Sequence, residues 1–304
     1  MTWERVQPLN AKDLLRSLQN AVEFCRVLGL DSSVELCRFG RYQERLSRLI
    51  TLLQPDEIGM IQSGLPQEVI TDYVDDSIIL IECAEFCFAI PYLMTLDRDI
   101  AAQKLKVILG GQKVLTDETA ISNQSRNVLF EIHLAAQAWR AGIATQVSPV
   151  ADLICEFEGR QLFIECKRPL SAKKIRQRIR EADKQLQRHL HLALPTCRGV
   201  IAISLSKLLN PDALLFAMRD RVEGQRIFEE KVQALAEEHS DVWSRLSKKV
   251  IGILFTATMA GLEPGSTLFL TVHHSLGYVL ANERSPSNRL FEMFHNKLSS
   301  VTPF

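Results

Sequence analysis

The sequence predicts two parts of different fold class, an all-α N-terminal part followed by a mixed α/β part. The first 118 residues carry apolar side chains at helical spacing, in segments separated by Pro and Gly. The pattern then changes to helices alternating with short β-rich runs, in the order α-β-β-β-α-β. Charge divides the chain at nearly the same place: residues 1–120 hold 12 Lys/Arg and 18 Asp/Glu, whereas residues 121–304 hold 24 and 18. We therefore expect an acidic helical domain over residues 1–118 and an α/β domain over residues 119–304.

The N-terminal part is expected to form a helical bundle, because helices follow one another with short connections. Asn10 caps the first of these helices and Gly29 ends it. The expected helices cover residues 10–28, 33–53, 67–73, 77–89 and 98–109. The stretch 77–94 is the most apolar of the chain, but Glu82 and Glu85 interrupt it. We expect a buried helix there rather than a membrane span.

The C-terminal part is expected to form a mixed sheet with flanking helices. Its first elements are a helix over 123–141, strands over 143–147, 152–157 and 161–167, a helix over 171–191 and a strand over 199–205. A charged helical stretch over 211–249, strands over 250–256 and 267–272, and a helix over 288–298 follow. This order of elements predicts a mixed α/β fold.

The cysteines and the N-terminal residues favour a reducing compartment. The seven cysteines are spread through apolar runs without a Cys-x-x-Cys pair, so we expect buried thiols rather than disulfides or a zinc site. The first residues, Met1 to Arg5, lack the apolar core of a signal peptide, which favours a cytoplasmic location without a membrane partner. No glycine-rich phosphate loop or Gly-x-Ser-x-Gly elbow occurs, so neither a nucleotide cofactor nor a serine hydrolase is expected.

A predicted hairpin brings two carboxylates together. The Glu-Gly dipeptide at 158–159 suits a two-residue turn, and the register of such a turn places Asp152 opposite Glu165. The Cβ atoms of two opposed residues in a sheet lie about 5 Å apart. Two carboxylates at such positions destabilise the sheet unless a cation neutralises them. Lys167 follows Glu165 by two residues and so lies on the same face of its strand. We expect these three side chains to form a site for a divalent cation.

Mg²⁺ or Mn²⁺ suits these oxygen ligands, because both cations keep water and phosphate oxygens in their coordination shell. Such a cation polarises a phosphodiester and acidifies a bound water, while a nearby lysine stabilises the developing charge. Glu131 in the preceding helix shares a stripe with Ala135 and Ala138, which leaves room for it to lean towards the metal. An ordinary, partly exposed helix carboxylate is the alternative for Glu131. The expected chemistry is phosphodiester hydrolysis.

These residues resemble the PD-(D/E)xK restriction-endonuclease-like nuclease superfamily, whose core has the same element order. The resemblance rests on Glu131, Asp152 and the run Glu165-Cys166-Lys167. It implies a restriction-endonuclease-like fold for the second domain. It also implies metal ligation by Asp152, Glu165 and the backbone carbonyl of Cys166. Catalytic assistance by Lys167 and an accessory metal role for Glu131 complete the implied site.

The resemblance covers about a quarter of the chain, residues 123–205. Ala151 stands where the first motif often has Pro, and Gln185 is followed four residues later by His189 where RecB-like members have Tyr. A second Glu-x-Lys, at 229–231, lies in a charged helical stretch and is expected to be solvated surface. Only the copy at Glu165 ends an apolar strand and faces an Asp.

The helix after the site is rich in cations. An apolar stripe packs this helix on the sheet and turns the cations outward, where they are expected to bind phosphates of nucleic acid. The alternative is a solvated face, or one that docks on the acidic N-terminal domain. The candidate nucleic-acid-binding residues are Lys173, Lys174, Arg176, Arg180, Lys184 and Arg188.

The predicted function is that of a Mg²⁺-dependent endonuclease acting on DNA, with RNA and a homodimer left open. The alternative is a non-catalytic nucleic-acid-binding or protein-interaction module that keeps the nuclease fold. A third interpretation, a helical adaptor with an unrelated second half, is favoured only if Asp152 and Glu165 lie far apart. The helical domain would position substrate, dimerise, or restrain the nuclease, for example by docking the acidic segment 56–97 on the basic helix.

Overall fold

A computed structural model gives the fold of most of the chain. It describes residues 11–52, 67–112, 119, 122–148, 150–210, 216–217, 221–243, 245–262, 270–282 and 284–301. The N-terminal helices within these ranges are α1 (Ala11–Val27), α2 (Asp31–Leu36), α3 (Arg38–Leu52), α5 (Gln67–Leu93) and α6 (Arg98–Leu109). The prediction that this part is helical is confirmed over the described residues.

Helix α5 differs from the expected pair of helices. It is continuous across residues 74–76 and runs through Pro91 to Leu93. Residues 74–76 contain neither Gly nor Pro, so the backbone offers no reason to stop there. Pro91 lies in the last turn, so the helical hydrogen bond that its missing N–H removes is near the end of the helix.

The second part has the predicted order of elements, with additions. It contains α7 (Gln124–Arg140), β1 (Ala144–Val147), β2 (Leu153–Phe157), β3 (Arg160–Lys167), α8 (Ala172–Leu192) and β4 (Arg198–Ser204). It continues with α9 (Ser206–Leu209), β5 (Phe216–Ala217), α10 (Arg221–Glu238), α11 (Ser240–Trp243), β6 (Val250–Leu262), β7 (Leu270–Leu280) and α12 (Asn288–Ser299). Elements α9 and β5 were not expected, and β6 and β7 extend further than the sequence predicted.

The strands form one mixed sheet. In the part of the chain that the structure describes, the sheet has seven strands in the order β1-β2-β3-β4-β6, with β5 and β7 both paired to β6. Strands β1, β2 and β3 are antiparallel neighbours, whereas β3, β4 and β6 are parallel. The carboxyl ends of these three parallel strands therefore meet at one edge of the sheet. The mixed α/β class is thus shown.

The β2–β3 hairpin has the predicted register. Leu153 pairs with Ile164 and Phe157 pairs with Arg160. Glu158 and Gly159 both have positive φ, 50° and 68°, as the two central positions of a type I′ turn require. This register places Asp152, immediately before β2, beside the end of β3.

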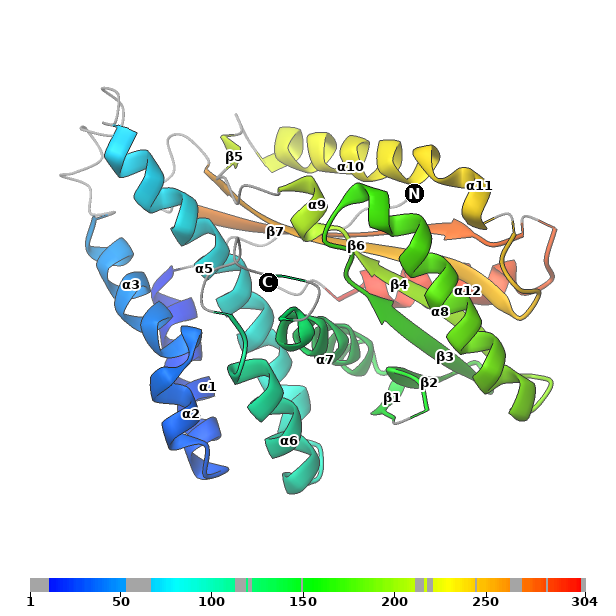
Figure 1. Cartoon of the computed structure of the whole chain (residues 1–304), viewed down its shortest axis with the longest axis horizontal. Helices are drawn as coiled ribbons and strands as arrows, with labels where there is room; N and C mark the ends of the chain where they lie inside the picture. Colours follow the sequence, from blue (N-terminus) through cyan, green and yellow to red (C-terminus); the bar gives the residue numbers. More distant parts are fainter. Residues whose placement is uncertain are drawn as a thin grey trace.

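Helices cover both faces of the sheet (Figure 1). Leu162 and Ile164 of β3 point to the face that packs on α7, α12 and the N-terminal helices. Phe163 points to the other face, where the apolar stripe of α8 packs together with side chains of α10 and α11. Figure 1 shows α8 crossing in front of the strands and α12 lying behind them. Strand β3 is therefore buried on both faces, as expected for a central parallel strand.

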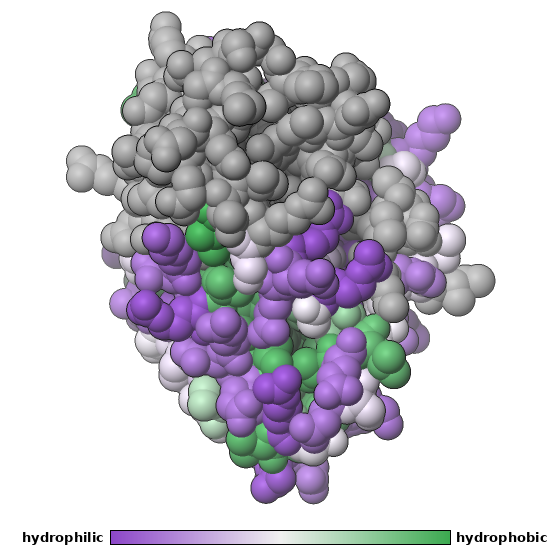
Figure 2. Space-filling view, turned by 90° about the vertical axis from the view of Figure 1, so that its left-hand side faces the viewer, coloured by the Kyte–Doolittle hydropathy of each residue, from purple (hydrophilic) through white to green (hydrophobic). Residues whose placement is uncertain are grey.

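The N-terminal helices and the α/β part share one hydrophobic core. Its buried residues include Leu18 of α1, Leu80 of α5 and Leu129 of α7. Figure 2 views the side of the molecule that the N-terminal helices form, and its described surface is mainly hydrophilic with smaller hydrophobic areas between charged groups. The division into two domains at residue 118 stays a prediction, and residues 113–118 lie outside the described residues.

Part of the expected acidic segment is buried. The Glu82 carboxylate accepts hydrogen bonds from Arg38 on α3 and Arg126 on α7, both at 2.5 Å. Helix α5 packs mainly on α7 and the other N-terminal helices, not on the basic helix α8. Residues 56 and 57 and the side chains up to residue 78 lie outside the described residues.

Two further expectations concern solubility and thiols. No helix among the described residues is long and apolar enough to cross a membrane. All seven cysteines lie in the described part of the chain, where they are free thiols, and six of them are buried.

Candidate active site

A cavity of about 420 Å³ lies where β3 ends. We call it the Lys167 cavity, because Lys167 is the last residue of β3. Helix α7 contributes Asn127 and Glu131, and the hairpin strands contribute Asp152, Cys166 and Lys167 with the adjoining Arg168. Helix α8 contributes Arg178, Glu181, Lys184, Gln185 and Arg188. Three elements that the sequence predicted around the site therefore enclose one space.

The Lys167 ammonium lies within ion-pair distance of both predicted carboxylates, Glu165 and Asp152. Its Nζ lies 2.9 Å from Oε2 of Glu165 and 3.6 Å from Oδ2 of Asp152. The same Asp152 oxygen accepts a hydrogen bond of 2.7 Å from the backbone N–H of Cys166. Burial favours the neutral amine, but Asp152 and Glu165 outweigh it and raise the pKa of Lys167 above its ordinary value. Because both carboxylates lie within reach of one nitrogen, the condition for the helical-adaptor interpretation is absent.

Glu165 lies behind Lys167 rather than in the cavity wall. It is 2% exposed, and its other oxygen, Oε1, is 3.7 Å from Nε2 of His189 on α8. Burial and the Asp152 charge raise the pKa of Glu165, while Lys167 lowers it. His189 was not among the site residues that the sequence predicted. The spacing of four residues from Gln185, which lines the cavity, is the signal that places His189 on the same face of α8.

Glu131 points into the Lys167 cavity from α7, and its side chain is 14% exposed. Burial and the nearby charge of Asp152 raise the pKa of Glu131 to about 7. Lys104 of α6, with Nζ 3.5 Å from Oε2 of Glu131, acts in the opposite direction. The N-terminal helices thus supply a charged side chain next to the candidate site. Sequence reasoning missed Lys104, since no local pattern links it to Glu131.

The six basic candidates of α8 occupy different environments. Lys184 and Arg188 line the Lys167 cavity. Arg176 instead bonds to Asp241 at 3.0 Å, so it fixes α8 to α11. Lys173, Lys174 and Arg180 are exposed on α8, and none of them is among the residues that line the cavity.

Two cations of the cavity wall were not among the candidates. Arg178 lines the cavity and bonds to Glu181 at 2.8 Å. Arg168 immediately follows Lys167 in the chain and also lines the cavity. The signal for Arg178 was its spacing, because positions 178, 181, 185 and 188 fall on one face of a helix.

The donor set of the cavity suits a hard divalent cation. Among the described residues, no group of three or more His, Cys, Asp and Glu is close enough to hold a metal by itself. Mg²⁺ is commonly held by only one or two carboxylates, with water and substrate phosphate completing its shell. Asp152 lines the cavity, and the buried Glu165 carboxylate lies 2.9 Å from the same Lys167 ammonium, so the two together provide that number of carboxylates.

Comparison with protein-family models, with curated proteins and with solved structures found no match to this chain. The description of the site therefore rests on the residues and geometry given above.

Proposed function

We propose that this protein is a metal-dependent nuclease and that the Lys167 cavity is its active site. The observation that carries the proposal is the convergence of Lys167 on Asp152 and Glu165, at the carboxyl end of a parallel strand. Ligands of α/β sheets commonly bind at that end of the strands. Within the proposal, the second part of the chain has a restriction-endonuclease-like fold.

Asp152, Glu165 and the backbone carbonyl of Cys166 would hold Mg²⁺ or Mn²⁺, with Glu131 in an accessory role. The metal, when bound, would polarise the phosphodiester and acidify a water. Lys167 keeps its proton, because Asp152 and Glu165 raise its pKa. A protonated Lys167 donates hydrogen bonds to the attacking water or to a phosphate oxygen on which charge develops.

The cations of the cavity wall support a polyanionic substrate. Lys184 and Arg188 lie on the α8 side and Arg168 lies beside Lys167. These side chains would contact backbone phosphates, which gives affinity that falls with salt and depends little on sequence. DNA is the proposed substrate. RNA is the alternative within the same chemistry.

The test incubates the purified protein with supercoiled, linear and single-stranded DNA and with RNA, in Mg²⁺, Mn²⁺ or chelator. We expect cleavage that requires the metal and falls by about 10²–10³ in Lys167→Met and Asp152→Asn, the loss typical of removing one transition-state contact. Lys231→Met is the matched control, because Lys231 belongs to the second Glu-x-Lys and is exposed on α10. Equal cleavage by all variants would indicate a contaminating nuclease.

One outcome would favour the alternative function. The Lys167 ammonium already supplies a counter-charge to this pair of carboxylates, which is an arrangement that a non-catalytic protein also tolerates. Salt-dependent binding of DNA or RNA without cleavage in either metal would favour a nucleic-acid-binding module. Loss of that binding in Lys184→Met together with Arg188→Met would place the bound strand against α8.

A further inference from the structure

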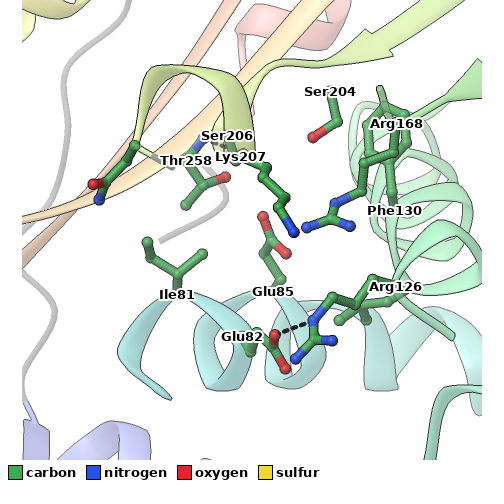
Figure 3. A pocket seen from close by; sticks show the side chains of 12 residues that line it. Ile81, Glu82, Glu85, Arg126, Phe130, Arg168, Ser204, Ser206, Lys207 and Thr258 are labelled. Carbon is green, nitrogen blue, oxygen red and sulfur yellow. Dashed lines mark hydrogen bonds and ion pairs between the residues drawn. The ribbon is translucent and has the colours of Figure 1, made fainter. Parts of the chain in front are cut away.

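A second cavity lies beside the Lys167 cavity at the same edge of the sheet. We call it the Glu85 cavity (Figure 3). Arg168, which directly follows Lys167, lines both cavities. Residues 126 and 130 of α7 line the Glu85 cavity, and the adjoining residues 127 and 131 line the Lys167 cavity, so both spaces border the same helix.

The size and position of the Glu85 cavity suit a small ligand group. Its volume is about 50 Å³, which is room for a few water molecules or one tetrahedral anion and is too little for a nucleobase. Arg168 follows the end of β3 and Ser204 ends β4, and these strands are parallel. The cavity therefore lies at the carboxyl ends of parallel strands, where sheets of this kind bind ligands.

The lining offers hydrogen-bond donors that recognise phosphate. Figure 3 shows the side chains of Arg168 and Lys207 directed towards Glu85 from opposite elements, with the Ser204 hydroxyl nearby. A guanidinium, an ammonium and a hydroxyl together match the oxygens of a phosphate group. Glu82, the other carboxylate of the lining, is already held by two arginines.

Glu85 is the second carboxylate of the lining. Burial raises its pKa to about 7, against the lowering effects of Thr258, Arg168 and Arg126, and Glu82 raises it further. A carboxyl group in this condition is neutralised by a proton near neutral pH, so it resists an anion less than an ordinary carboxylate does.

We propose that the Glu85 cavity binds a phosphate group of the nucleic acid, next to the phosphodiester that lies in the Lys167 cavity. The proposal rests on the proposed function, because it takes the substrate to be a nucleic acid. Arg168 lies at the boundary and contacts both phosphates, and Lys207 contacts the second. Glu85 lines the same cavity as these cations. The cavity thereby fixes the strand relative to the reacting phosphodiester.

Two substitutions test the proposal because they act in opposite directions. Binding of a short 5′-phosphorylated single-stranded oligonucleotide is measured in chelator, where no metal-dependent cleavage occurs. We expect Lys207→Met to weaken binding by about tenfold or more, the loss of a charge-assisted hydrogen bond. At pH 8, above the raised pKa of Glu85, Glu85→Gln should tighten binding severalfold, because it removes a negative charge beside the phosphate. Lys207→Arg should restore most of the affinity.

Controls separate binding from folding. Lys231→Met is the matched control, since Lys231 is exposed on α10 and lines neither cavity. Thermal unfolding of each variant identifies those that are merely destabilised. Equal affinity in all variants would overturn the proposal. A loss of affinity in both Lys207→Met and Glu85→Gln would do so as well, because it indicates a structural ion-pair cluster.

Inorganic phosphate distinguishes the source of the ligand. If phosphate alone binds in a Lys207-dependent manner and the oligonucleotide does not, the cavity takes a free anion and the proposal of a strand contact is overturned. Failure of the proposed function looks different. If the oligonucleotide binds in a Lys207-dependent manner but is not cleaved in any metal, the proposed nuclease function is wrong and the proposed phosphate site stands. If Lys207→Met leaves cleavage unaffected, only the proposed phosphate site is wrong.

Discussion

Glu82 holds two arginines in the core beneath α7. Its oxygens accept hydrogen bonds from Arg38 and Arg126, and all three side chains are buried. Glu82→Gln leaves two buried guanidinium groups without a counter-charge. We expect the free energy of unfolding at pH 7 to fall by about 3–5 kcal/mol, as measured by chemical denaturation. Glu23→Gln, which breaks the exposed pair with Arg26, should cost less than about 1 kcal/mol.

The Glu82 carboxylate also makes the free energy of unfolding depend on pH in the acidic range. Burial by itself raises the pKa of Glu82, but Arg38 and Arg126 lower it from 4.5 to about 2. A lowered folded-state pKa contributes stability that is present above the unfolded value and is lost as pH falls through the folded value. The stability difference between the original chain and Glu82→Gln should therefore shrink between about pH 4.5 and pH 2. A difference that stays constant over that range would contradict this assignment.

Glu131 is expected to titrate near neutral pH in the metal-free protein. Burial and Asp152 raise its pKa to about 7, and Lys104 opposes them. Lys104→Met should therefore raise the pKa of Glu131 further, which carbon NMR of the glutamate carboxyl groups measures directly. Lys106→Met, on the same helix and exposed, should leave it unchanged. An equal pKa in both variants would show that Lys104 does not act on Glu131.

Residue partners of this kind were the least predictable part of the site. Arg38 and Arg126 each lie 44 residues from Glu82, so no local pattern links them. The sequence placed Glu82 in an expected buried helix and in the acidic segment 56–97, and neither assignment identifies its partners. Lys167 and Glu165 were predictable, because a separation of two residues in a strand fixes a shared face. Whether these residues act in catalysis stays a prediction.

The β2–β3 hairpin was the most predictable element, because a two-residue turn fixes the register of the paired residues that follow.

The turn of this hairpin contains a residue that lowers its stability. Glu158 has a φ of 50°, which costs free energy for most side chains and less for Asn. We expect Glu158→Asn to raise the free energy of unfolding by up to about 1 kcal/mol. A lower free energy of unfolding for Glu158→Asn, measured by chemical denaturation, would mean that the turn is not type I′ in solution.

Other elements were less predictable for physical reasons. Helix α5 joined two expected helices because residues 74–76 contain neither Gly nor Pro, and from Ile79 onward its side chains pack in the shared core. Strands β6 and β7 ran beyond their expected ends because they pair with each other over their full described length. Pairing between strands depends on partners distant in sequence, so alternation within one segment underestimates it.

At the scale of the whole molecule, the opposed charges of the two halves do not mark a free boundary between them. The apolar side chains of α5 and α7 belong to one continuous core, and Lys104 and Glu82 reach α7 from the N-terminal helices. Removing residues 1–118 would expose the face of α7 that these helices cover. The candidate site therefore depends on the helical part for the position of α7, which carries Glu131.

A shared core predicts that the whole chain unfolds as one unit. We expect thermal unfolding of the full chain, followed by near-ultraviolet circular dichroism and by calorimetry, to show a single cooperative transition with coincident midpoints. Because Glu82 joins α3, α5 and α7, Glu82→Gln should lower the midpoint of that one transition without splitting it. Two transitions, with only the lower one shifted by Glu82→Gln, would mean that the helices and the sheet are separate cooperative units. In that case a stable fragment lacking the helices becomes feasible, and its nucleic-acid binding would show directly whether the helical part restrains the site.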